Sequence, residues 1–277
     1  MVLKTHHIVA RDLPDLWFQA VSGLFNKGRK FVVDQGSYDG DGNKKDAQER
    51  LQYDFFTGHI LNPGYGSGTP EILPQIPAHY NIPNPVAFEY VYGGEGYTRS
   101  YLEYVMTAVK QPGESYTYGE RLVKAELSDR ILALMFQGNP KMINPRKVDG
   151  KIIFMDNDRL YLNQIEAIID TYKKFGPGNN QMVLQVAQPE DLQLKDPPCL
   201  RSIGTQIIDN KLHFTPVEFR SWDLWGGLPA NLAAIQGIKE YMAGEIGVED
   251  GEMIVQSKKL HIYTYAEELA KIRCMKR

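Results

Sequence analysis

The part of this chain that decides its fold reads Asp196-Pro197-Pro198-Cys199, then Arg220-Ser221-Trp222-Asp223, then Gly226-Gly227-Leu228-Pro229-Ala230-Asn231. Cys199 is one of only two cysteines among 277 residues. The two prolines hold the cysteine backbone extended, because proline fixes its own φ and restrains the residue before it. A buried structural cysteine needs no such neighbours. A lone thiol followed by an arginine and a carboxamide therefore indicates covalent chemistry on an anionic substrate that forms hydrogen bonds.

Runs of β-forming residues surround these stretches. Beyond the breaker Gly176-Pro177-Gly178, the apolar period changes from that of a helix to that of strands. Pro229 is expected to begin a long helix, since the amide hydrogen that proline lacks would be unpaired in a first turn anyway. Asp209-Asn210 is expected to form a hairpin turn. The predicted strands cover residues 182–186, 203–208, 211–219, 253–255 and 261–265.

The N-terminal side of the chain is predominantly helical in pattern. Apolar spacing predicts helices over residues 13–27, 97–109 and 160–174, and a strand over residues 31–34. Prolines and glycines in residues 62–85 predict an irregular surface loop, followed by a buried segment at 88–92. No repeat, low-complexity tract or linker interrupts the pattern. The sequence therefore predicts a single α+β domain over residues 1–277.

The composition excludes several classes of protein. An apolar share of 43% is ample for a core, and a formal net charge of −3 does not match nucleic acid. No apolar run approaches the roughly 20 residues that span a bilayer, and the N-terminus lacks the apolar region of a signal peptide. Two cysteines without an export signal favour a reduced compartment. We therefore expect a soluble cytoplasmic protein without a metal site and without a nucleic-acid or membrane partner.

Six motifs follow one another in a characteristic order. They are Tyr118-Gly119-Glu120-Arg121-Leu122, Asn163-Gln164-Ile165, Pro197-Pro198-Cys199, Phe219-Arg220-Ser221-Trp222-Asp223, Gly227-Leu228-Pro229-Ala230-Asn231 and His261-Ile262-Tyr263. In this order and spacing the chain resembles the thymidylate synthase and deoxycytidylate hydroxymethylase superfamily. It is most similar to the short archaeal-type synthases. The resemblance covers residues 160–265 well and the N-terminal part only loosely.

The resemblance implies a fold, a substrate and a partner. The fold is a twisted mixed β-sheet covered by helices, with one sheet face packed against a second subunit in a homodimer. The apolar runs 182–186 and 211–219 agree with this, since they hold more β-branched and aromatic residues than a solvent-facing sheet needs. The substrate is a pyrimidine nucleotide, and 5,10-methylenetetrahydrofolate is the implied cofactor and carbon source.

Cys199 is the candidate nucleophile. The C5 carbon of a pyrimidine is a poor nucleophile until a thiolate adds at C6, which makes C5 able to attack a one-carbon electrophile. A thiolate needs a nearby positive charge. The resemblance places Arg220 close to this sulfur and on the nucleotide phosphate, which suits the forked donors of an arginine. The alternative is that Cys199 is merely a small buried apolar residue.

Asn231 is the candidate base reader. Its carboxamide offers one acceptor and one donor, which match N3–H and O4 of uracil. Hydroxymethylases of cytosine nucleotides usually have aspartate at this position, so asparagine favours a uracil base. The alternative is a polar residue that caps its own helix.

The remaining candidates are implied by the resemblance. His261 and Tyr263 lie on one face of a strand and would hold the sugar hydroxyl, although a strand histidine is often structural. Ser221, Asp223 and Gly227 would contact the phosphate or the base, and Asp223 could instead pair with the backbone.

Two N-terminal residues are further catalytic candidates. Glu89 is a carboxylate in an apolar run, where burial would raise its pKa and suit a proton relay. It could equally be an edge residue that faces solvent. Tyr118 is expected near the thiol, where it would help to remove the C5 proton.

The chain also departs from the family pattern. Asn179-Asn180-Gln181 stands where many members have Ser-Arg-Arg, and Asp34-Gln35-Gly36-Ser37 replaces an arginine-bearing loop. Leu200 follows the cysteine where a histidine is common, and the tail that closes over folate has no counterpart.

Several functions therefore stay open. Methylation of dUMP at C5 is the leading one. The alternatives are hydroxymethylation of dUMP, dCMP or CMP, an inactive dimeric binding protein, and a cysteine hydrolase that uses Cys199 and His261.

Overall fold

The computed structural model describes residues 2–33, 48–64, 97–138 and 148–275. Three predictions lie outside these ranges and are not taken further. They concern most of the loop at residues 62–85, the segment at residues 88–92 with Glu89, and Asp34-Gln35-Gly36-Ser37.

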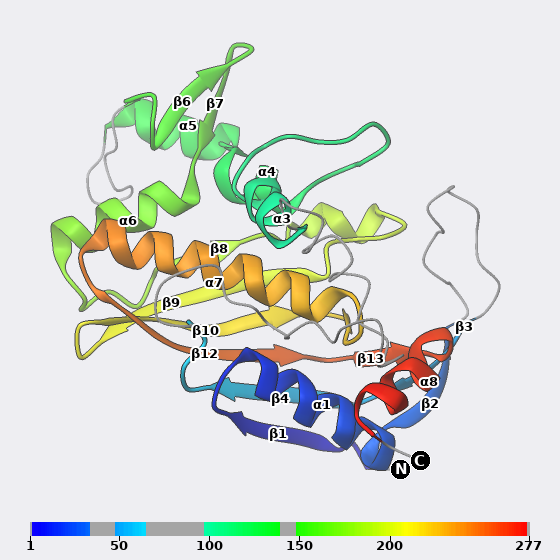
Figure 1. The fold of residues 1–277 in the computed structure, drawn as a ribbon. Helices are drawn as coiled ribbons and strands as arrows, with labels where there is room; N and C mark the ends of the chain where they lie inside the picture. The colour runs from blue at the N-terminus through cyan, green and yellow to red at the C-terminus, as the bar shows by residue number, and fades with distance from the viewer. Residues whose placement is uncertain (1, 34–47, 65–96, 139–147, 276–277) are drawn as a thin grey trace.

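The largest sheet has six strands in the spatial order β1-β4-β12-β10-β9-β8 (Figure 1). Strands β1 and β4 pair in parallel, as do β10 and β12, whereas the other neighbours are antiparallel. The prediction of a mixed sheet is therefore confirmed. The strands are β1 Thr5–Ala10, β4 Phe55–Ile60, β8 Val183–Gln185, β9 Leu200–Ile208, β10 Lys211–Phe219 and β12 Glu249–Ser257.

The hairpin between β9 and β10 turns at Asp209-Asn210, as predicted. Both residues have positive φ angles, 48° and 58°, which a two-residue turn of type I′ requires and which Asp and Asn tolerate. Strand β9 starts earlier than residue 203, because Leu200 already pairs with Phe219. Cys199 therefore lies directly before the first residue of β9 and beside the last residue of β10.

A second sheet has four strands in the order β11-β13-β3-β2. Its register places Asp223 opposite His261, His261 opposite Gln52, and Tyr263 opposite Arg50. Residues opposite each other on neighbouring strands, and residues two apart on one strand, point to the same face. These five side chains therefore share one face of the sheet. The strands are β2 Arg29–Val33, β3 Gln48–Gln52, β11 Trp222–Asp223 and β13 Leu260–Tyr263.

Helix α7, Gly227–Ile246, crosses the six-stranded sheet and packs on β10 and β12 (Figure 1). It begins two residues before Pro229, which still lies in its first turn. Gly247 ends the helix with a φ of 87°, a value that glycine adopts without strain. Helix α1, Leu13–Lys27, has the predicted bounds and packs on β1 and β4.

The apolar side chains of β10 face helix α7. Leu212, Phe214, Val217 and Phe219 are fully buried, whereas the polar residues His213, Thr215 and Glu218 between them are half-buried. The apolar content of residues 211–219 therefore belongs to the core of this chain. It does not by itself indicate a second subunit.

Three helix boundaries differ from the prediction. Residues 160–162 belong to a strand, and the next helix starts after Asn163, whose side-chain oxygen accepts the amide of Glu166 at 3.2 Å. Residues 264–265 belong to the last helix and not to the strand before it. The helix that starts at Tyr97 is shorter than residues 97–109. The elements are α3 Tyr97–Val105, β7 Arg159–Leu162, α6 Gln164–Phe175 and α8 Thr264–Arg273.

A small three-stranded sheet in the order β5-β7-β6 was not predicted. With it the chain has the mixed α+β architecture expected from the sequence.

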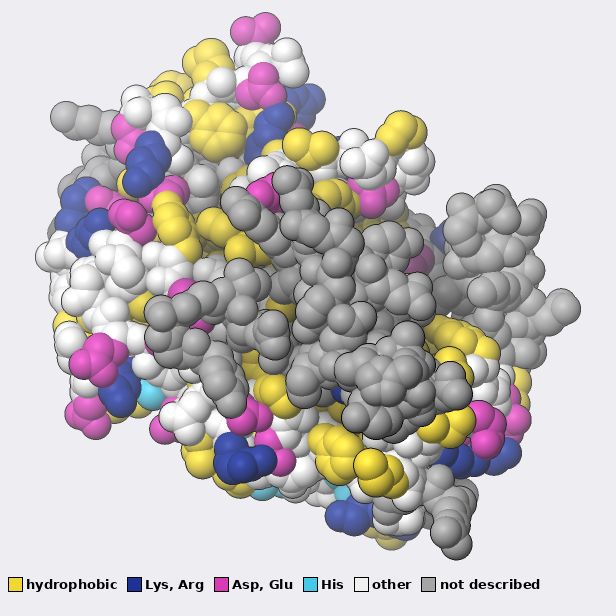
Figure 2. Space-filling model, viewed as in Figure 1, with side chains coloured by type: hydrophobic (Ala, Val, Ile, Leu, Met, Phe, Trp, Pro, Cys, Tyr) yellow, Lys and Arg dark blue, Asp and Glu magenta, His cyan; other side chains and the backbone are white. Residues whose placement is uncertain are grey.

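Acidic and basic side chains are interspersed over the described surface in Figure 2. None of the described helices is long and apolar enough to cross a membrane. The remaining elements are α4 Tyr118–Val123, β5 Ala125–Glu126, α5 Asp129–Gln137, β6 Ile153–Asp156 and η2 Pro189–Gln193.

Candidate active site

Cys199 and Arg220 are held together by the backbone. The amide of Arg220 donates to the carbonyl of Cys199 at 2.8 Å, where β9 and β10 meet. The Arg220 guanidinium folds back over the segment before the cysteine, and its Nε donates to the carbonyls of Pro197 and Pro198, both at 3.2 Å. Its Nη2 donates to Asp196 Oδ1 at 2.9 Å. The motif thus positions its own arginine beside its thiol.

Opposing effects determine the pKa of the Cys199 thiol. Burial raises the pKa of the Cys199 thiol, and the Arg220 guanidinium opposes this rise. Asp196 raises the pKa further, while Arg201 and Arg50 lower it. The net pKa lies above that of an ordinary cysteine, so the thiol form prevails at neutral pH until the surroundings change.

Tyr118 lies beside this cysteine, as predicted. It begins helix α4, whose first turn is capped by Thr117 through a 2.9 Å hydrogen bond from the amide of Glu120. The Tyr118 hydroxyl accepts the amide of Leu200, the residue after the cysteine, at 3.2 Å. Burial raises the pKa of Tyr118, and the neighbouring Cys199 adds to the rise. The tyrosine therefore stays protonated near the thiol.

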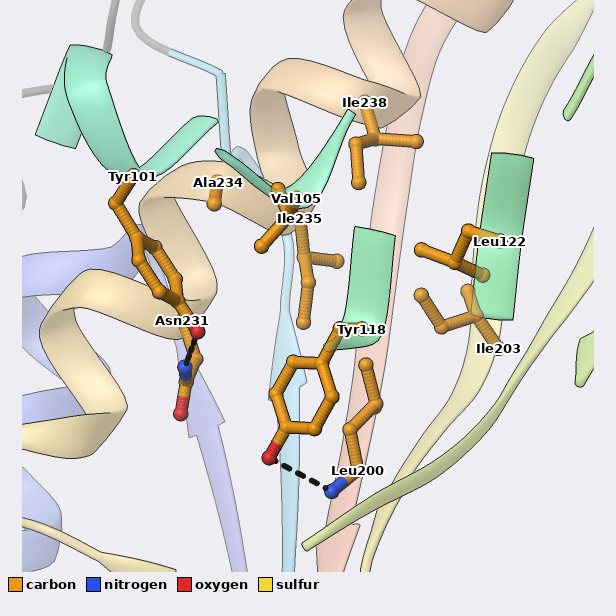
Figure 3. A pocket seen from close by; sticks show the side chains of 10 residues that line it. All are labelled: Tyr101, Val105, Tyr118, Leu122, Leu200, Ile203, Asn231, Ala234, Ile235 and Ile238. Atoms are coloured by element: carbon orange, nitrogen blue, oxygen red, sulfur yellow. Dashed lines mark hydrogen bonds between the residues drawn. The ribbon is translucent and has the colours of Figure 1, made fainter. Parts of the chain in front are cut away.

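The carboxamide of Asn231 has a fixed orientation (Figure 3). Its Oδ1 accepts the indole Nε1–H of Trp222 at 2.9 Å, and its Nδ2 donates to the Tyr101 hydroxyl at 2.7 Å. An indole N–H can only donate, so Oδ1 and not Nδ2 must face Trp222. Gly226, and not Asn231, is the N-cap of helix α7. The alternative that Asn231 caps its own helix is therefore excluded.

Tyr101, Tyr118, Leu200 and Asn231 meet around a small cavity of about 10 Å³ (Figure 3). Asn231, the candidate that reads the base, and Leu200, the residue after Cys199, therefore line the same cavity. The rest of the lining is aliphatic and comes from Val105, Leu122, Ile203, Ala234, Ile235 and Ile238.

His261 is buried in a neutral state. Its Nδ1 lies 2.9 Å from the carbonyl of Lys259, which can only accept, so Nδ1 carries the proton. Burial, together with the positive charge of Arg50, lowers the pKa of His261 to about 3. Its Nε2 is then an acceptor, and it has no hydrogen-bond partner among the described residues. The Tyr263 ring lies edge-on to the imidazole, with ring centroids 4.8 Å apart.

The other predicted contacts cluster at the start of helix α7. Asp223 accepts the amides of Trp225 and Gly226 at 3.0 and 3.2 Å, which fits the alternative that it pairs with the backbone. Burial raises the pKa of Asp223. Gly227 lies against the Asp223 and Asn231 side chains, and Ser221 is half-buried in the link from β10 to β11.

Sequence reasoning missed four residues of this site. Asp196 and Trp222 belong to the motifs around Cys199 and Arg220, but no role was predicted for either of them. Tyr101 and Arg50 lie outside the motifs. Arg50 lies on the strand over residues 48–52, and this strand was not predicted. In the segment Asn179-Asn180-Gln181, the Gln181 amide donates to Asn179 Oδ1 at 2.8 Å.

Comparisons with known proteins agree with these observations. A sequence profile described as thymidylate synthase matches residues 112–277. A protein of Methanosarcina mazei that carries the provisional name thymidylate synthase is 22% identical over 258 residues, which are 93% of this chain and 89% of that protein. A protein of Methanosarcina acetivorans with the same provisional name is 32% identical over 104 residues, which are 38% of this chain and 48% of that protein.

The fold is also similar to that of a solved structure, the thermostable thymidylate synthase A of Bacillus subtilis. The TM-score is 0.58 at 16% sequence identity, over 96% of this chain and 85% of that one. The profile match spans well over half of the chain and includes Cys199, Arg220, Asn231 and His261. The chain therefore belongs to the thymidylate synthase family, a family of methyltransferases.

Proposed function

We propose that this protein methylates dUMP at C5, by way of a covalent bond between Cys199 Sγ and pyrimidine C6. The observation that carries this proposal is the fixed carboxamide of Asn231, at the same small cavity as Tyr118 and Leu200. Trp222 donates to one lone pair of Oδ1, and Tyr101 accepts one hydrogen of Nδ2. The second lone pair of Oδ1 and the second hydrogen of Nδ2 are therefore available to bind a base. An acceptor and a donor side by side match N3–H and O4 of uracil.

The nucleophile must lose its proton before it can add to C6. Arg220 favours the thiolate, whereas burial and Asp196 oppose it. Removal of the proton from C5 requires a base, and Tyr118, which stays protonated, would donate a hydrogen bond to that base.

His261 supports a sugar ligand. Its buried Nε2 is an acceptor without a partner among the described residues, and leaving such an atom unpaired is costly. A sugar hydroxyl would supply the missing donor. Since β13 lies beside β11, which leads into α7, the sugar and the base would bind to adjoining elements.

Members of this family normally use methylenetetrahydrofolate, which would supply the one-carbon unit and the hydride. The lining beside Tyr101 fits an aromatic ring in its chemistry, because it is aromatic and aliphatic. The cavity of about 10 Å³ has room for roughly one water molecule, so the rings of folate, like the uracil ring, would have to bind outside it. We therefore assign no residue to folate and derive no step through it.

The test is to incubate the protein with methylenetetrahydrofolate and, in turn, dUMP, dCMP, UMP or CMP, and to weigh the products by mass spectrometry. We expect a methylated product from dUMP, with no product from dCMP. A Cys199→Ala preparation serves as the matched control for a contaminating enzyme. A hydroxymethylated product would establish the alternative activity, and no product from any nucleotide would refute both.

We also propose that the protein is a homodimer. The face of the six-stranded sheet that points away from α1 and α7 includes the half-buried residues Thr57, Ile254 and His213. This broad face, and not the buried apolar side of β10, is the surface that would meet a second copy. Sedimentation at micromolar concentration should give the mass of a dimer, and a stable monomer would contradict the proposal.

A further inference from the structure

Asp191 is a buried carboxylate that lies outside the six sequence motifs. It belongs to η2, in the segment that leads to Cys199, and its exposed fraction is 1%. Its Oδ1 accepts Nη2 of Arg121 at 2.8 Å, and its Oδ2 accepts the amide of Gln188 at 2.8 Å. Arg201 Nη1 lies 3.9 Å from the same Oδ2. A carboxylate is tolerated in the interior where cations and amide donors surround it, so these partners fix the position of Asp191.

The two arginines come from the two elements that carry the candidate catalytic side chains. Arg121 lies in α4, three residues after Tyr118. Arg201 lies in β9, two residues after Cys199, and its Nη1 donates to the carbonyl of Pro198 at 3.2 Å. The carboxylate between the two arginines therefore joins the helix of the tyrosine to the segment of the nucleophile.

Further contacts lead from Arg121 to Tyr118. The Arg121 guanidinium lies over the ring of Tyr116, 5.8 Å from its centroid. The rings of Tyr116 and Tyr118 are stacked in turn, with centroids 6.5 Å apart and planes at 25°. The carbonyl of Arg121 accepts Nε2 of Gln164 at 2.7 Å, so its backbone is held as well. Arg121 and Gln164 belong to two of the sequence motifs, but no role was predicted for either of them. Their contacts fix α4 and, through it, the tyrosine.

We propose that Asp191 is a positioning residue, which holds the Tyr118 hydroxyl beside the residue that follows the nucleophile by way of Arg121. The inference rests on the proposed function, because it takes Tyr118 to act in the removal of the C5 proton. Asp191 does not line the cavity beside Asn231, so its effect is indirect. A displacement of about 1 Å can slow a reaction by about 100-fold, whereas binding of the nucleotide depends on other residues.

Two variants separate positioning from stability. Asp191→Asn removes the anionic partner of the buried Arg121, so it should lower the melting temperature. The double variant Arg121→Met with Asp191→Leu removes both charges. Replacing a buried ion pair by apolar side chains of similar volume is often neutral for stability, so the double variant should melt close to the wild type. It nevertheless lacks the contacts that fix Tyr118.

Hydrogen exchange of the Leu200 amide measures the position of Tyr118 directly, because this amide donates to the Tyr118 hydroxyl at 3.2 Å. In the double variant the Leu200 amide should exchange about ten-fold faster, while the amides of residues 203–208 in the same strand exchange as in the wild type. The kcat for dUMP should fall about 10- to 100-fold in both variants. The dissociation constant of dUMP, measured by calorimetry, should stay within about three-fold.

Glu120→Gln is the matched control. Glu120 lies on the same helix, next to Arg121, and its Oε1 is paired with Lys110 Nζ at 2.7 Å. The Glu120 side chain is 27% exposed, whereas that of Asp191 is 1% exposed. Breaking this more exposed pair should leave the exchange of Leu200 and the kcat within about two-fold of the wild type.

Four outcomes would overturn the inference. An unchanged kcat or an unchanged exchange of Leu200 in the double variant would show that the ion pair serves stability alone. Equal losses of kcat and of dUMP affinity would show that Asp191 shapes the binding site. A loss of kcat in Glu120→Gln as large as in Asp191→Asn would show that any change in α4 has this effect.

Folding and the proposed function are judged separately. If Asp191→Asn does not fold, the double variant decides the question. If neither folds, the pair is required for the fold itself and the inference is overturned. A wild type that does not turn over dUMP refutes the proposed function, whereas the exchange of Leu200 decides by itself whether Asp191 positions Tyr118.

Discussion

Replacing Asn231 with aspartate is the sharpest test of base choice. The Trp222 indole can still donate to a carboxyl oxygen, so the hydrogen bond that it forms with Asn231 Oδ1 at 2.9 Å is kept in the variant. The Tyr101 hydroxyl, which accepts from Nδ2 at 2.7 Å, can turn and donate instead. The surrounding structure is therefore preserved. The substitution instead affects how the base is bound, because the N–H that would donate to O4 of uracil is lost.

The magnitude follows from one mismatched polar contact. A buried, protonated carboxyl can donate to N3 of cytosine and accept from its exocyclic amine, whereas uracil presents the opposite order. One such mismatch costs about 1–3 kcal/mol. The ratio of kcat/KM for dUMP over dCMP should therefore fall by about 10- to 100-fold in Asn231→Asp.

The assay measures kcat/KM for both nucleotides under saturating folate. Tyr101→Phe is the matched control, because it removes one partner of the carboxamide while Trp222 still fixes its orientation. That variant should slow both substrates to the same extent and leave their ratio unchanged. An unchanged ratio in Asn231→Asp would mean that Asn231 does not face the base, and the choice of dUMP would lose its main support.

Three further predictions concern the thiol and the imidazole. Cys199→Ala should abolish turnover while dUMP affinity in calorimetry stays within a few-fold, and activity above a few per cent would refute the covalent mechanism. Asp196→Asn should lower the pKa of Cys199, because Asp196 raises it and occupies Arg220; the midpoint of the pH profile for iodoacetamide alkylation should move to lower pH, and a higher midpoint would contradict the assignment. His261, with its pKa held at about 3, binds no proton between pH 6.5 and 3 when folded but binds one when unfolded, so stability is lost as the pH falls through this window. Urea unfolding at pH 7 and pH 5 should show that the wild type loses about 2 kcal/mol more than His261→Gln, and equal losses would show that the imidazole is not held neutral.

The sequence by itself determined the parts of this protein that depend on short-range geometry. The turn at Asp209-Asn210 follows from two residues that tolerate positive φ, and the bounds of α1 follow from apolar spacing over 15 residues. The motif around Cys199 likewise identified the nucleophile candidate and placed Arg220 beside it. Where local signals compete, the sequence was less informative. Leu160 fits a helical period, but Asn163 starts the helix and leaves residues 160–162 to a strand.

Only the tertiary structure decided how the site is assembled, because its contacts join residues far apart in the chain. Tyr101 and Asn231 are 130 residues apart, and Tyr118 and Leu200 are 82 apart, so no local pattern relates them. The neutral state of His261 depends on burial and on a backbone carbonyl, neither of which a sequence displays. Arg50 becomes a site residue only because β3 pairs with β13, which brings it opposite Tyr263. Residue types thus determined which chemistry is possible, and strand register decided which groups can act on one ligand.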